Sequence, residues 1–131
     1  MTATSARNAL TITAAIAGAL ALWTVTDPIA GIDLAVRQGP VGPGAVIVTS
    51  LLAGLAAWAL LAVMRRTLTN PQRAWTITAT VVLAISLLGP LGSASNAASA
   101  LVLTGMHLLV GAVLIIGLRR SALRGDDRAR R

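Results

Sequence analysis

The sequence predicts an all-α protein: a bundle of four transmembrane helices with a short amphipathic helix in the first outer loop. Of its 131 residues, 56% are hydrophobic and only 11% are charged. A soluble domain carries about 25% charged residues, so this chain lacks the polar surface that a protein in water needs. The second observation is the spacing of the charges, which leaves long apolar stretches between them.

These uncharged stretches divide the chain into spans. Nineteen residues separate Arg7 from Asp27, 27 separate Arg37 from Arg65, and 45 separate Arg73 from Arg119. A bilayer core needs about 20 helical residues, so the first two stretches hold one span each and the third holds two. We expect one membrane domain, residues 1–131, with spans near 9–26, 44–64, 74–91 and 97–118 and a basic tail, 119–131.

The first span has an alternative interpretation as a signal peptide. Arg7, the apolar run after it and the small residues of AGALA resemble the three regions of such a peptide. The run is long for a signal peptide, and an even number of spans suits two termini on one side of the membrane. An uncleaved first helix is therefore favoured.

The first outer loop, residues 26–44, reads TDPIAGIDLAVRQGPVGPG. An Asp27-Pro28 start, a glycine-proline stop and apolar residues at helical spacing predict a helix over residues 28–38, lying at the outer interface. Asp33 and Arg37 stand four apart and would form an exposed ion pair, which contributes little. Alternatively, Asp27, Asp33 and Arg37 line the mouth of a polar site. The first interpretation is favoured.

Helix starts, a turn and pairs of small residues can be recognised along the four spans. Gly42-Pro43 and Asn70-Pro71 are helix starts, and Asn96 can cap the fourth helix. The turn formers of residues 89–99 predict a hairpin, with Gly89-Pro90 ending or kinking the third span. Small residues four apart allow helices to approach closely. Such pairs are Ala14 and Gly18, Ala15 and Ala19, Ser50 and Gly54, and Ala53 and Ala57.

The fourth span carries the one histidine of the chain, His107, near the membrane centre. Steps of three and four residues place Ala100, Thr104, His107 and Gly111 on one side of the helix, which should face other helices. Because ionisable groups at this depth are functional candidates, His107 and Thr104 form a candidate polar membrane site. The alternative, which is favoured, is a structural imidazole that hydrogen-bonds across a helix interface to Ser86, Thr78 or a backbone carbonyl.

The composition argues against several kinds of site. The chain has no cysteine, and no second histidine or acidic residue lies in any span. We therefore expect no metal, no other cofactor and no catalytic residues. The net charge of +7 comes from arginines at the ends of apolar runs, which indicates membrane topology and no nucleic-acid partner.

The arginines also predict orientation. The N-terminus, residues 65–73 and the tail hold ten of the eleven arginines, whereas the first loop holds only Arg37. The positive-inside rule then places both termini in the cytoplasm of a multi-pass plasma-membrane protein. The basic tail could also bind anionic lipid.

Four strings resemble a known family. GIDLAVRQG, LAGLAAWALLAVMRR, ISLLGPLGSA and MHLLVGAVLI together look like an uncharacterised family of small actinobacterial membrane proteins, domain of unknown function 6069. The resemblance covers nearly the whole chain and implies four membrane helices, but no activity or site. Small multidrug resistance transporters are similar in size only, because their membrane-embedded glutamate has no counterpart here.

Three classes of function follow. The favoured class is a non-enzymatic membrane protein that acts by helix packing, as a homo-oligomer or as an accessory subunit of another membrane protein. The second is a small transporter or proton-linked carrier that uses His107. The third is an intramembrane enzyme, for which no nucleophile, base and orienting group are visible.

Overall fold

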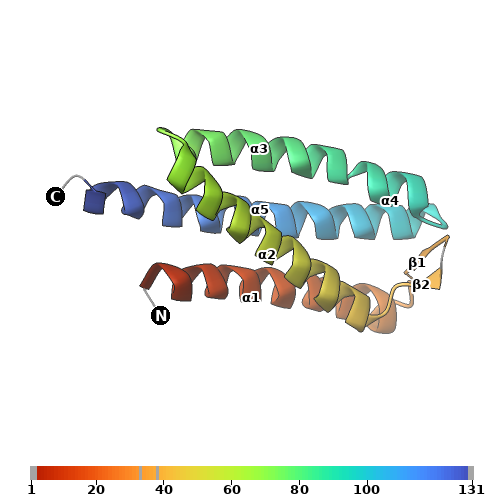
Figure 1. Ribbon diagram of the computed structural model, residues 1–131. Coiled ribbons are helices and arrows are strands. Elements are labelled where there is room, and N and C mark those ends of the chain that lie inside the picture. Colours follow the sequence, from red (N-terminus) through yellow and green to blue (C-terminus); the bar gives the residue numbers. More distant parts are fainter. Residues whose placement is uncertain (1–2, 33, 38, 130–131) are drawn as a thin grey trace.

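The fold is a bundle of helices in which four segments are long and apolar enough to cross a membrane (Figure 1). The computed structural model describes residues 3–32, 34–37 and 39–129, with side chains from residue 5 to residue 119 of that part. The four segments are Ser5–Ile29, Pro43–Thr67, Pro71–Ser93 and Ala97–Arg119. The all-α four-helix bundle is thus confirmed, and most segments extend a few residues beyond the expected spans.

Five α-helices make up these segments. They are α1 (Ala3–Thr24), α2 (Pro43–Thr67), α3 (Pro71–Ser86), α4 (Leu88–Ser93) and α5 (Ala97–Ala129). Helix α5 runs through the middle, α1 and α3 lie on either side of it, and α2 crosses obliquely (Figure 1). Both chain ends lie at one end of the bundle, the terminal end; the loops between α1 and α2 and between α4 and α5 lie at the other, the loop end.

Two helices are capped at their first turn by the asparagines that the sequence indicated. The Asn70 side chain accepts a hydrogen bond from the backbone N–H of Arg73 at 3.2 Å, which caps α3. The Asn96 side chain accepts one from the backbone N–H of Ser99 at 2.8 Å, which caps α5. Both bonds satisfy N–H groups that have no partner within the helix.

The small-residue pairs are used largely inside the bundle. Ala15 and Ala19, on α1, are 0% and 1% exposed. Gly54 of α2 lies so close to Ile12 that an added Cβ would stand 2.8 Å from the Ile12 Cγ2 atom. Likewise, a Cβ added to Gly111 of α5 would stand 2.6 Å from the Leu83 Cδ1 atom of α3. Small side chains therefore determine how closely the helices approach.

The third span is kinked and does not end at Gly89-Pro90. Helix α3 ends at Ser86, and after Leu87 the short helix α4 continues to Ser93. Proline lacks the N–H that would bond to the carbonyl four residues earlier, here that of Ser86, and its ring crowds that carbonyl. The hairpin expected over residues 89–99 therefore contracts to the residues between α4 and α5.

The helix predicted over residues 28–38 is wrong. Helix α1 instead continues through a π-helical turn, η1 (Val25–Ile29), and the chain turns at Gly31, whose φ is +70°. Two short strands follow, β1 (Ala35–Val36) and β2 (Gly39–Pro40), paired antiparallel. Leu34, just before β1, is 1% exposed. The backbone of this loop finds partners in the loop before α5, which local spacing does not reveal.

Gly54 provides a test of the packing. Gly54→Ala should destabilise the bundle by about 1–3 kcal/mol, because the buried, β-branched Ile12 cannot easily yield to the new methyl group. The control is Gly44→Ala, in the same helix, where an added Cβ meets nothing within 4 Å. Denaturant titration in detergent micelles measures both. Equal stability of the two variants would contradict the close contact.

Candidate functional site

The His107 ring is anchored to its own helix. The side chain is half-buried, and its Nδ1 atom lies 2.8 Å from the carbonyl oxygen of Leu103. A carbonyl only accepts, so Nδ1 carries the hydrogen and donates it; in the neutral ring, Nε2 then remains an acceptor. Within the described part of the chain, Nε2 has no hydrogen-bond partner. The partner of the ring is thus a backbone carbonyl of its own helix, whereas the partner was expected across a helix interface.

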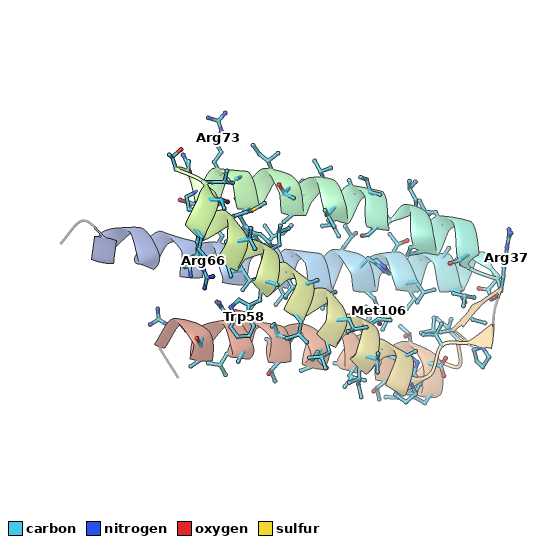
Figure 2. All side chains as sticks on the ribbon, in the orientation of Figure 1. Arg37, Trp58, Arg66, Arg73 and Met106 are labelled. Atoms are coloured by element: carbon cyan, nitrogen blue, oxygen red, sulfur yellow. The ribbon has the colours of Figure 1, made fainter. Side chains whose placement is uncertain are left out.

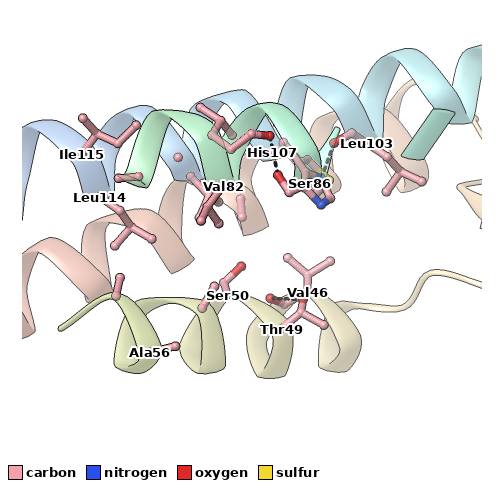
Figure 3. Close-up of a pocket in the computed structure, with 18 of the residues that line it drawn as sticks. Val46, Thr49, Ser50, Ala56, Val82, Ser86, Leu103, His107, Leu114 and Ile115 are labelled. Atoms are coloured by element: carbon pink, nitrogen blue, oxygen red, sulfur yellow. Dashed lines mark hydrogen bonds between the residues drawn. The ribbon is translucent and has the colours of Figure 1, made fainter. Parts of the chain in front are cut away.

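His107 lines an elongated cavity of about 500 Å³ between α2, α3 and α5 (Figure 3). Most of the lining is apolar, and the polar exceptions besides His107 and the Trp75 indole are hydroxyl groups on α2 and α3. The Thr49 hydroxyl donates to the carbonyl of Ala45 at 2.6 Å, and the Ser86 hydroxyl donates to that of Leu83 at 2.7 Å. Both donor hydrogens are therefore used within their own helices.

Ser50 differs from these two residues. It is only 7% exposed, yet its hydroxyl has no hydrogen-bond partner among the described residues. Figure 3 shows this hydroxyl pointing from α2 into the cavity, toward the side where Ser86 and His107 lie. Sequence reasoning treated Ser50 only as half of a small-residue pair with Gly54. One serine four residues from a glycine carries no further signal.

The structure does not bring Thr104 into this cavity. Thr104 precedes His107 by three residues on α5 but is not part of the lining. Its Oγ1 atom is buried, and it has no hydrogen-bond partner within the described residues. The expected pair of His107 and Thr104 is therefore divided: only His107, with Gly111 from the same side of the helix, reaches the cavity.

The outer-loop residues do not form a common site in the part of the chain that is described. The Asp27 carboxylate accepts a hydrogen bond from the backbone N–H of Leu34 at 2.8 Å. Arg37 is exposed at the loop end, and its side chain points away from the bundle (Figure 2). Asp33 lies outside the described residues. Asp27 therefore bonds to the backbone of its own loop, while the Arg37 side chain points away from the bundle.

The loop that contains β1 is tied to the turn between α4 and α5. The carbonyl of Ala35 accepts from the Ser95 N–H at 3.1 Å and from its hydroxyl at 3.0 Å. The Ala35 N–H donates to the hydroxyl of the fully buried Ser99 at 3.2 Å, and the Arg37 N–H donates to the Ser93 carbonyl at 2.9 Å. These bonds cover the loop end of the bundle with hydrogen-bonded backbone.

Comparison with known proteins gives one match. The model of a family described as a family of unknown function (DUF6069) matches residues 1–124, which include the cavity and the outer loop. No curated protein and no solved structure matches the chain.

The Asp27 bond can be tested at a single amide. Asp27→Ala should speed hydrogen exchange at the Leu34 amide by about ten- to hundredfold, because a hydrogen bond to a charged group contributes about 1.5–3 kcal/mol. Asp27→Asn keeps an acceptor oxygen and should fall between the native chain and the alanine variant. NMR exchange in micelles resolves this amide. An unchanged rate in Asp27→Ala would show that the carboxylate does not hold the loop.

Proposed function

The chain belongs to the family of unknown function (DUF6069), and we propose that it is a non-enzymatic membrane protein. It acts by helix packing within the bilayer, as a homo-oligomer or as an accessory subunit of another membrane protein. The observation that carries this proposal is an exposed face of small residues on α1.

This face consists of residues four apart. Ala9, Thr13, Ala17 and Ala21 are all exposed, while the opposite side of α1 packs on α2 and α5. The Thr13 hydroxyl donates to the Ala9 carbonyl at 3.0 Å, so it adds little polarity to the face. Without bulky side chains along this row, another helix can approach the α1 backbone closely, and such packing drives helix association in lipid.

The composition of the cavity supports a non-enzymatic role and argues against a proton-linked carrier. Among the described residues, His107 is the only acidic or basic side chain that lines the cavity, so a proton relay has no second group there. No hydrogen bond joins His107 to Ser50 or Ser86 in the described part of the chain. A nucleophile, a base and an orienting group are the minimum for acyl transfer, and these residues do not supply that set.

The proposal includes an orientation in the plasma membrane with both termini in the cytoplasm. Arg66 and Arg73 lie toward the terminal end of the bundle, and Arg37 lies at the loop end (Figure 2). The positive-inside rule supports this placement. Helix α5 continues past its membrane segment to Ala129, and the arginines of this tail would attract anionic lipid with about 1 kcal/mol each.

Cross-linking tests the association. Because the chain has no cysteine, Ala17→Cys introduces a single thiol on the exposed face of α1 and should yield a covalent dimer under oxidation in membranes. Ile77→Cys, exposed on α3, is the control and should remain monomeric. Ala17→Leu should weaken association about tenfold by separating the helices. Dimers that form through residue 77 and not through residue 17 would place the interface elsewhere.

Thiol labelling tests the orientation. An impermeant maleimide added to intact cells should label Ala30→Cys at the loop end but not Thr69→Cys between α2 and α3; both positions are exposed. Permeabilised cells should label both, which controls for reactivity. Labelling of residue 69 in intact cells would reverse the proposed topology.

A further inference from the structure

We propose that the cavity beside His107 is a binding groove for a lipid-soluble alcohol with one hydrocarbon chain. This inference goes beyond helix association and does not depend on it. It rests on the shape of the cavity, on where the cavity opens, and on two polar atoms without partners.

The cavity is long and narrow. Its lining on α2 runs from Val46 to Leu60, and these two residues lie about 21 Å apart along the axis at the rise of an α-helix. A cavity of about 150 Å³ can hold benzene, so a volume of about 500 Å³ along that length suits one extended hydrocarbon chain. A helix about 10 Å across and about 21 Å long occupies about 1,600 Å³, so a helix of a second copy of the chain does not fit in the groove.

The groove opens sideways into the region that lipid would occupy. Ala53, Ala56 and Leu60 of α2, with Val82 of α3, line the cavity and are exposed. All four lie within the segments suited to cross the membrane. A ligand therefore enters from the bilayer, which selects a molecule that dissolves in lipid.

Two polar atoms select the chemical group. Among the described residues, the hydroxyl of Ser50, a residue only 7% exposed, is a donor without a partner, and the His107 Nε2 atom is an acceptor without a partner. A ligand hydroxyl offers an acceptor to the first and a donor to the second. An alkane would leave both unsatisfied in an apolar surrounding, and a carboxylate, which only accepts hydrogen bonds, would offer no donor to Nε2 of the neutral ring.

The position of these atoms orients the ligand. Ser50 lies seven residues from the start of α2, about 10 Å along the helix from the loop end. From there to Trp75 and Ile115 the lining is almost wholly apolar. The hydroxyl therefore sits between Ser50 and His107, and the chain runs toward the terminal end, to Trp75.

Quenching of Trp75 fluorescence tests this arrangement. The probe is a fourteen-carbon primary alcohol brominated near its methyl end, added to the protein in phosphatidylcholine nanodiscs. Because Trp75 is 2% exposed, probe molecules in bulk lipid reach it poorly, and a Trp75→Phe variant isolates its signal. We expect saturable quenching by the alcohol and only weak, non-saturable quenching by the matching brominated alkane.

Five variants complete the experiment. Ser50→Ala and His107→Phe each remove one polar partner and should weaken binding about three- to tenfold, whereas His107→Gln keeps an acceptor and should bind closer to the native chain. Ala53→Leu should fill the groove and abolish saturation. Ala59→Leu, exposed on the same helix but outside the lining, is the control and should bind as the native chain does.

Three results would overturn the proposal. These are an absence of saturable quenching, equal quenching by alcohol and alkane, and a loss of binding in Ala59→Leu as large as that in Ala53→Leu.

Discussion

Close approach of helices through small side chains is the constraint on which this structure depends. In lipid, burying apolar side chains gains little over leaving them in the bilayer, so contact between helices must come from packing at short range. Ala15 is completely buried, and Gly54 and Gly111 receive Ile12 and Leu83 where any larger residue would collide. These small residues therefore allow the close approach of α2 to α1 and of α3 to α5.

The spans were predictable because one physical cause dominates them. A charge inside hydrocarbon costs several kcal/mol, so the spacing of the charged residues limits where the helices can span. Capping by Asn70 and Asn96 was equally local: each side chain bonds to an N–H three residues on. The kink of the third span also follows from one residue, Pro90. Whether the third span would end at Pro90 or continue beyond it was less predictable, because a helix that continues needs packing partners as well as backbone hydrogen bonds.

The outer loop shows where local reasoning fails. Asp27-Pro28 is a good helix start, and the spacing of apolar residues after it is helical. Yet Asp27 bonds to Leu34, and the backbone of Ala35 bonds to Ser95 and Ser99, which lie 60 and 64 residues away in sequence. These bonds satisfy the loop without a helix, and a single sequence does not reveal such distant partners. Without that helix, Asp27 in η1 and Arg37 after β1 do not lie on one helical face.

The cavity follows from the same use of small residues that packs the bundle. Ala53, Ala57 and Ala79 have small side chains, so a space remains between α2, α3 and α5 that larger side chains would fill. An unfilled volume forfeits dispersion contacts along its lining. Water is a poor filler, because each buried water needs two to four polar partners and most of this lining is apolar. Hydrocarbon fills the space without that cost, and the hydroxyl of Ser50 and the imidazole of His107 then favour a chain that carries a polar group of its own over one that does not.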